Sequence, residues 1–263
     1  MASQAHPRVL VTRSAGQASE LATQLSALGL EPVIVPAIEL APPSSFEELD
    51  RALRGLADFH WVIFTSANAV EAFHQRIEAL GFKAGTQVRI AAIGPATARA
   101  LEAIGLAVEI VPAQAVAESM AEALLVHARQ SDGSPARFLL VRAEEARDVL
   151  PDALRAAGAE VKIAPAYRTV LAAGSMDAIR SLFANPGSVA AITFTSSSSA
   201  RNLLALCEAA GVALPSSALR VSIGPITSET LRSLGYPPHA EALEATVAAL
   251  AQAVREAVDE PAS

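Results

Sequence analysis

Small and hydroxylic residues stand directly after several apolar segments of the sequence and directly before predicted helices. These stretches are Thr12-Arg13-Ser14, Thr65-Ser66-Ala67-Asn68, Gly94-Pro95-Ala96-Thr97, Thr195–Ser199 and Gly224-Pro225-Ile226-Thr227. The first turn of a helix has unpaired N–H groups and the positive end of the helix dipole, so it attracts anions. Ligands of parallel sheets bind at the carboxyl ends of the strands. The stretches therefore predict a polyanion site built from amides and hydroxyls, although Ser and Thr before a helix also serve as plain caps.

The residues used by common cofactors, metals and nucleophilic catalysts are not arranged in known motifs. The five histidines are scattered, and no two have the i, i+4 spacing of a helical metal site. No glycine-rich dinucleotide motif or phosphate loop follows an apolar segment. Cys207 lies in the middle of a helical pattern, where a core position is the simpler interpretation. We therefore expect no metal and no nucleotide cofactor.

Short segments rich in β-branched residues alternate with helical patterns along the chain. The predicted buried strands are Val9–Val11, Val33–Val35, Val62–Phe64, Ile90–Ile93 and Val108–Val111. Between them, Ser45-Phe-Glu-Glu48 has the pattern of a capping box that starts a helix. Ser66 precedes a helix that ends at Gly81, and Pro95 begins another. Strands that alternate with helices indicate parallel sheets covered on both faces, which is an α/β fold.

The sequence contains an internal repeat in which matching segments lie 129 or 130 residues apart. The matching segments are Arg8–Arg13 with Arg137–Arg142, Glu31–Pro36 with Glu160–Pro165, Phe64–Ser66 with Phe194–Ser196, and Ile93–Thr97 with Ile223–Thr227. A nearly constant offset predicts two similar parallel-sheet domains, each flavodoxin-like or Rossmann-like. The extended segments that follow Pro36 and Pro165 predict two linkers between these domains.

Composition excludes several classes of protein. The chain has 263 residues, of which 52% are hydrophobic, so it can form one large core or two smaller ones. The formal net charge of −7 argues against a nucleic-acid partner. A single cysteine excludes a disulfide framework. No apolar run approaches the ~20 residues of a membrane span, and Met1–Pro7 has no feature of a secretory signal, so we expect a cytoplasmic protein.

Taken together, these motifs resemble the uroporphyrinogen-III synthase family over nearly the whole chain, from about Val9 to Val258. The resemblance rests on Val11-Thr-Arg13, Phe64-Thr-Ser-Ala-Asn-Ala-Val70, Ile93-Gly-Pro-Ala-Thr97, Ala166-Tyr-Arg-Thr169, Phe194-Thr-Ser-Ser197 and Ile223-Gly-Pro-Ile-Thr227. Each motif is short, and the order and spacing of the set make it specific.

The resemblance implies two α/β domains joined by a two-stranded β-ladder. One domain would comprise residues 7–37 and 168–263 and the other residues 38–167, with the active site in the cleft between them. The implied reaction closes the linear tetrapyrrole hydroxymethylbilane to uroporphyrinogen III, with loss of water and inversion of ring D. The family uses no cofactor and no metal, and we expect a monomer.

The resemblance also assigns roles to residues of this chain. Tyr167 is similar to a family tyrosine that faces the cleft, and we expect it to assist departure of the substrate hydroxyl. The expected substrate-binding residues are Arg13, Ser66, Ala67, Thr97, Ser196, Ser197 and Thr227. They would hold the eight carboxylates of the substrate through backbone amides, hydroxyls and one guanidinium.

Two other functions fit the residues considered without the resemblance. Two α/β lobes also occur in non-catalytic modules that bind or sense small anions. A transferase acting on sugars or phosphates would have the same architecture. An assay of the product isomer distinguishes the three.

Overall fold

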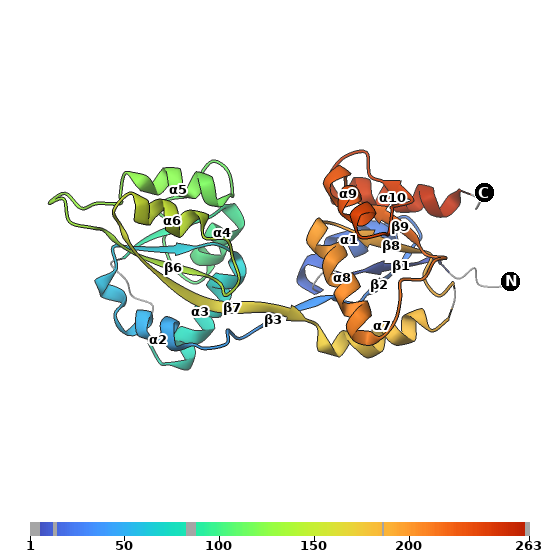
Figure 1. The fold of residues 1–263 in the computed structure, drawn as a ribbon, viewed down its shortest axis with the longest axis horizontal. Coiled ribbons are helices and arrows are strands. Elements are labelled where there is room, and N and C mark those ends of the chain that lie inside the picture. The colour runs from blue at the N-terminus through green and yellow to red at the C-terminus, as the bar shows by residue number, and fades with distance from the viewer. Residues whose placement is uncertain (1–5, 13–14, 83–87, 186, 261–263) are drawn as a thin grey trace. The chain divides into compact units, whose positions relative to one another are not determined.

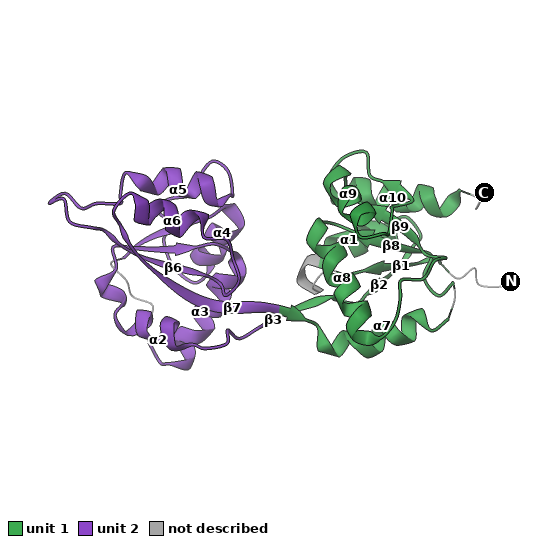
Figure 2. Ribbon diagram, viewed as in Figure 1, with its two compact units in different colours: residues 1–39, 170–263 green, residues 40–169 purple. Residues whose placement is uncertain are grey.

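The structure is a computed structural model that describes residues 6–12, 15–82, 88–185 and 187–260, without the side chains of residues 15–17. The chain forms two compact units (Figure 2). Unit 1 comprises residues 1–39 and 170–263, and unit 2 comprises residues 40–169. The chain therefore passes from one unit to the other twice.

Unit 1 alternates strands and helices along the chain (Figure 1). Its elements are β1 (Arg8–Val11), α1 (Ala15–Ala27), β2 (Glu31–Ile34), η2 (Ala173–Ser175), α7 (Met176–Phe183), β8 (Ala191–Phe194), α8 (Ser197–Ala210), β9 (Leu219–Ser222), α9 (Pro225–Ser233), β10 (Ala240–Glu241) and α10 (Val247–Asp259). The sheet has the order β10-β9-β8-β1-β2, and the registered pairs β1·β2, β1·β8, β8·β9 and β9·β10 are parallel.

Unit 2 is built on the same plan. Its elements are β3 (Ile38–Ala41), α2 (Glu47–Arg54), η1 (Leu56–Asp58), β4 (Trp61–Phe64), α3 (Ala67–Ala79), β5 (Arg89–Ala92), α4 (Pro95–Ala103), α5 (Ala117–Leu125), β6 (Arg137–Ala143), α6 (Val149–Ala156) and β7 (Glu160–Leu171). The sheet order is β3-β7-β6-β4-β5. The first residues of β3 and the last residues of β7 lie where the chain changes units.

The internal repeat reappears in the strand order. With the offset of the sequence repeat, β1, β2, β8 and β9 correspond to β6, β7, β4 and β5. The orders β2-β1-β8-β9 and β7-β6-β4-β5 then match position by position. The predicted parallel α/β architecture is thus confirmed for both halves of the sequence.

Each sheet is covered by helices on both faces, as the alternation of strand side chains requires. In β4, Val62 and Phe64 join a core that includes residues of α2, α3 and α4. The alternate residues Trp61 and Ile63 join a second core with α5 and α6. All four side chains are almost completely buried, which explains why β4 is an unbroken apolar run.

The strand predicted at Val108–Val111 is wrong. The structure has a single isolated bridge there, between Ala91 and Ile110. At the corresponding place in unit 1, the N–H of Ala242 donates to the oxygen of Ser222 (2.9 Å) and extends the ladder. The residue that corresponds to Ala242 is Pro112, which has no N–H to donate, so the ladder ends.

The capping box predicted at Ser45–Glu48 is also wrong. Helix α2 begins at Glu47 with Phe46 at the N-cap position, and no side chain caps it. The hydroxyl of Ser45 accepts instead from the N–H of Glu47 (3.1 Å). Three acidic side chains in the first turn complement the helix dipole without a cap.

Candidate active site

Ser66 lies between the carboxyl end of β4 and the first turn of α3, as the sequence predicted. Its backbone is extended, and its hydroxyl accepts from the N–H of Ala69 (3.0 Å), so it is the N-cap of α3. The same hydroxyl lies 3.1 Å from the phenol oxygen of Tyr167. The structure therefore brings together two predicted site residues that are 101 positions apart in the sequence.

Tyr167 is placed by an irregularity in the pairing of β6 with β7. Arg142 pairs with Pro165, but the next residue, Ala143, pairs with Tyr167, so Ala166 is the extra residue of a bulge. Bulges change the direction of the side chains that follow them. The carbonyl of Tyr167 is held by the N–H of Glu144 (2.8 Å). The backbone on both sides of this tyrosine is therefore fixed.

A cavity of about 430 Å³ adjoins the Ser66–Tyr167 pair within unit 2. Its polar lining residues are Tyr167, Asn68, Gln75, Glu71 and Arg76, and the other lining residues, such as Leu40 and Ala166, are apolar. A concave lining that combines apolar and polar groups is typical of small-molecule sites. Asn68 was not among the predicted site residues, although it lies in the same loop motif as Ser66.

Thr97 and Thr227 occupy the first turns of α4 and α9, and both side chains are buried, with 3% and 4% of their surface exposed. Each follows a Gly-Pro pair in which the glycine is the N-cap and the proline is the first helical residue. Neither N-cap glycine has a side chain that could occupy the N–H groups of the turn. The threonines and the N-cap glycines are buried, and the exposed residues of the two turns are Pro95 and Ala96 in α4 and Pro225 and Ile226 in α9.

Ser196 and Ser197 are engaged with their own unit. Ser196 caps α8 in a reciprocal capping box with Ser199, in which both hydrogen bonds measure 3.1 Å. The hydroxyl of Ser197 lies 2.6 Å from that of Thr230 in α9. The contact of Ser197 with Thr230 joins the first turn of α8 to the second turn of α9. Ala67, which corresponds to Ser197 in the repeat, has only its backbone to offer at the start of α3.

Arg13 and Cys207 are the remaining residues that the sequence analysis singled out. Arg13 lies outside the described residues. Cys207 is buried in the core of unit 1, as predicted, and burial raises the pKa of its thiol to about 11. In the described part of the chain, no group of three or more His, Cys, Asp or Glu residues is arranged to hold a metal ion. Among those residues, too, no helix is both long and apolar enough to cross a membrane.

Sequence reasoning missed Arg142, which is buried at the carboxyl end of β6 (7% exposed). The repeat offered a signal, because Arg142 corresponds to Arg13. The guanidinium of Arg142 donates to the oxygen of Arg147 (3.0 Å) and to Oδ1 of Asp148 (2.7 Å). It therefore holds the loop that follows β6.

Known proteins match the chain over nearly all its length. The family model described as uroporphyrinogen-III synthase HemD matches residues 19–252. A uroporphyrinogen-III synthase of Synechococcus elongatus is 37% identical, with 94% of each chain covered. A putative uroporphyrinogen-III synthase of Methanothermobacter thermautotrophicus is 33% identical, with 95% of this chain and 99% of that protein covered.

Two solved structures have a similar fold. A uroporphyrinogen III synthase structure from Thermus thermophilus gives a TM-score of 0.59 at 21% identity, with 96% of this chain and 98% of that chain covered. A uroporphyrinogen-III synthetase structure from Helicobacter pylori gives 0.58 at 21% identity, with coverages of 94% and 97%. The sequence matches do not favour a non-catalytic binding module. The chain therefore belongs to the uroporphyrinogen-III synthase family of tetrapyrrole biosynthesis enzymes.

Proposed function

We propose that the chain carries out its family's reaction, the closure of hydroxymethylbilane to uroporphyrinogen III, and that Tyr167 protonates the departing hydroxyl. The observation that carries the proposal is the contact between the phenol of Tyr167 and the hydroxyl of Ser66 beside the 430 Å³ cavity. Ser66 is fixed as a helix cap, so it gives the phenol a defined orientation. A hydroxyl leaves as water once it accepts a proton, which is general acid catalysis.

Positioning accounts for the rest of the chemistry. Loss of water from the bilane leaves a cation, and ring closure must occur at the substituted carbon of ring D. Attack there gives a spiro intermediate, whose rearrangement inverts the ring. Holding the two reacting carbons together supplies most of the selectivity, because oriented groups react as though very concentrated.

We propose that the eight carboxylates of the substrate bind at the carboxyl edges of both sheets. The residues concerned are Arg13, Ser66, Ala67, Thr97, Ser196, Ser197 and Thr227. For Thr97 and Thr227, burial of the hydroxyls favours contact through other N–H groups of the first turns, because the N–H of Thr227 already donates to the oxygen of Gly224 (3.1 Å). Ser66 and Ser196 already accept cap hydrogen bonds, and each retains acceptor or donor capacity for a carboxylate or a bridging water.

We further propose that β3 and β7, which are neighbours in the sheet order, form a two-stranded ladder joining two substrate-binding domains. In this arrangement residues 7–37 and 168–263 form one domain, residues 38–167 form the other, and the substrate lies in the cleft between them. The chain would act in the cytoplasm as a monomer, without a metal or cofactor. Light scattering with and without substrate tests the monomer.

The activity is tested by adding the purified chain to hydroxymethylbilane and oxidising the products. Chromatography separates the type I and type III isomers, and we expect type III. Buffer without protein is the control, since the free bilane closes to type I. Type I alone in the presence of folded protein would contradict the proposed function.

A further inference from the structure

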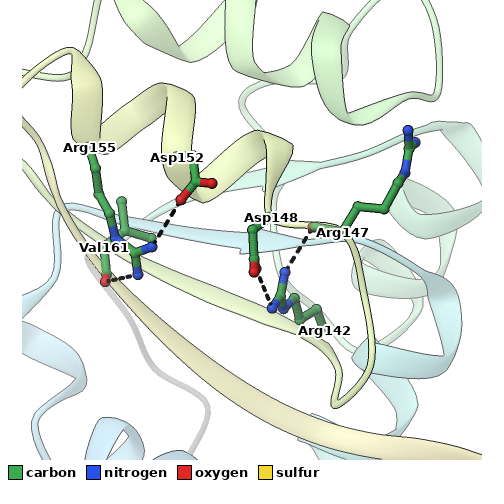
Figure 3. Close-up of polar contacts among 6 residues, drawn as sticks. All are labelled: Arg142, Arg147, Asp148, Asp152, Arg155 and Val161. Carbon is green, nitrogen blue, oxygen red and sulfur yellow. Dashed lines mark hydrogen bonds and ion pairs between the residues drawn. The ribbon is translucent and has the colours of Figure 1, made fainter.

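Arg142 carries a buried charge at the carboxyl end of β6. Only 8% of its side chain is exposed. Its guanidinium bonds to the oxygen of Arg147 and to Oδ1 of Asp148, and its Nε has no hydrogen-bond partner among the described residues. Figure 3 shows both bonds. Burying a guanidinium costs several kcal/mol unless it is paired, so its partners reveal what it holds.

Both partners lie in one short loop. Arg147 and Asp148 are five and six residues beyond Arg142, in the segment that connects β6 to α6. The buried charge thus does not join distant parts of the chain. It fixes the course of a loop at the carboxyl edge of the sheet.

The loop lies beside the candidate acid. The sheet order β7-β6-β4 places the end of β6 between the strand that contains Tyr167 and the strand that precedes Ser66. Within the loop, the N–H of Glu144 donates to the carbonyl of Tyr167 (2.8 Å). The loop therefore starts at the same edge of the sheet as the Ser66–Tyr167 pair, and Arg147 reaches from it towards Glu118 of α5, which packs on the face opposite to α3.

The loop presents Arg147. Its side chain is 73% exposed and in Figure 3 extends away from Arg142 and Asp148. Its ion pair with Glu118 is long (3.5 Å) and exposed on both sides, so it contributes little. The backbone of Arg147, by contrast, is anchored through its carbonyl to Arg142. An anchored backbone with a weakly held guanidinium is suited to binding an anion from solution.

Two acidic residues of the loop already have hydrogen-bond partners. Oε2 of Glu144 accepts from the N–H of Ser44 (3.0 Å), and Asp148 is paired with Arg142. Glu144 and Asp148 are therefore committed elsewhere, whereas Glu145 is exposed.

We propose that Arg147 binds a carboxylate of the substrate and that Arg142 is a positioning residue that holds Arg147 in place. The inference rests on the proposed function, because the ligand is one arm of a polycarboxylate tetrapyrrole. A guanidinium binds a carboxylate through two parallel hydrogen bonds, which gives both strength and direction.

The test compares steady-state kinetics of variants with hydroxymethylbilane. For Arg147→Ala we expect KM to rise about tenfold, as for loss of a hydrogen bond to a charged group, with kcat within about twofold of the unchanged chain. Arg147→Lys should recover part of the loss. The matched control is Arg155→Ala, because Arg155 is a half-exposed arginine of α6 that is bound to Asp152 and the oxygen of Val161 (Figure 3). Its KM should not change.

The positioning role is tested with Arg142→Met, which keeps much of the length of the side chain and removes its charge. It should raise KM to a similar extent, and adding Arg147→Ala should raise KM little further, because both changes remove one interaction. If Arg142→Met does not fold, Asp148→Asn weakens the same anchor and should give a smaller rise in KM.

Two results would overturn the inference. One is a KM for Arg147→Ala equal to that of Arg155→Ala. The other is additive effects of the Arg142 and Arg147 changes, which would make Arg142 a general stabilising residue. Both leave the proposed function standing when the unchanged chain forms the type III isomer. Failure of the unchanged chain to form that isomer would refute the proposed function itself.

Discussion

Replacing Tyr167 by Phe removes one hydroxyl and leaves the ring. In the folded state the change deletes the contact with Ser66 at 3.1 Å, a single hydrogen bond of a half-buried side chain. Such a bond stabilises a protein by about 0.5–1.5 kcal/mol. For a chain of this size, that corresponds to a fall in Tm of only a few degrees. The ring itself still packs against the core of unit 2.

The expected effect on the reaction is much larger. General acid catalysis contributes about 10²–10⁴-fold, which corresponds to about 2.7–5.5 kcal/mol of activation free energy. This range does not overlap the cost to stability, so kinetics and thermal unfolding together separate a lost proton donor from a weakened fold. The assay is the initial rate of type III formation at saturating substrate, with Tm measured on the same preparation.

Two further variants complete this experiment. Ser66→Ala removes the same hydrogen bond and also the cap of α3, at about 1 kcal/mol of stability, but it leaves the phenol proton in place. We expect it to slow the reaction only about tenfold. Tyr236, the only other tyrosine of the sequence, packs against the core of unit 1. Tyr236→Phe should therefore leave the rate unchanged. A rate for Tyr167→Phe within about threefold of the unchanged chain would refute the donor role.

Three other predictions follow from contacts within each unit. A Cβ on Gly94 would lie only 2.7 Å from the Cβ of Ala115, whereas a Cβ on Gly224 would lie 3.8 Å from the Cβ of Ala245. We therefore expect Gly94→Ala to lower the free energy of unfolding by about 1–3 kcal/mol and Gly224→Ala to leave it nearly unchanged, as measured by urea unfolding. Hydrogen bonds from Arg76 hold the pKa of Asp50 below its ordinary value, so this pair stabilises the fold above about pH 4 and the contribution disappears as pH falls through the lower folded-state pKa. Asp50→Asn should therefore cost about 2 kcal/mol at pH 7 and progressively less in acid; an equal cost at pH 7 and pH 2 would contradict this. Burial raises the pKa of Cys207 to about 11, so a disulfide reagent at pH 8 should label this thiol only at the rate of unfolding, and rapid labelling of the folded chain would be inconsistent with the core position.

The strands that were predicted correctly are those whose formation depends mainly on their own residue types. Val62–Phe64 and Ile90–Ile93 lie in or directly beside β4 and β5 because apolar, β-branched runs fit a sheet that is covered on both faces. The Gly-Pro pairs at the starts of α4 and α9 were equally readable, because proline suits the first helical position. The strand at Val108–Val111 failed because strand formation also depends on the neighbour, and Pro112 cannot donate to it.

The candidate site was readable only in part. The position of Ser66 followed from local signals, because a serine between an apolar run and a helix is a cap. Its contact with Tyr167 did not follow, because that contact depends on a bulge in β7 and on a separation of 101 residues. Arg142 was not predicted as a site residue for a related reason. Its partners are close in sequence, but its burial depends on the packing of the whole unit.

The two halves of the repeat have diverged at the sheet edge in a way that bears on their roles. In unit 1, Ser222 and Ser228 are fully buried and hydrogen-bonded to each other (2.6 Å), and Ser228 also donates to Glu241. The corresponding residues of unit 2 are Ala92, Ala98 and Val111, which cannot form such a chain.

A network of this kind rigidifies the turn that contains Thr227, because each hydroxyl would be costly to leave unpaired. Unit 2 instead has the Ser66–Tyr167 pair and the loop held by Arg142. The duplicated fold thus has a hydrogen-bonded, stiffened turn in unit 1, whereas unit 2 has the partly buried Ser66–Tyr167 pair at the corresponding edge of its sheet. This division is consistent with a reaction in which one part of a polycarboxylate must be held still while its terminal ring turns over.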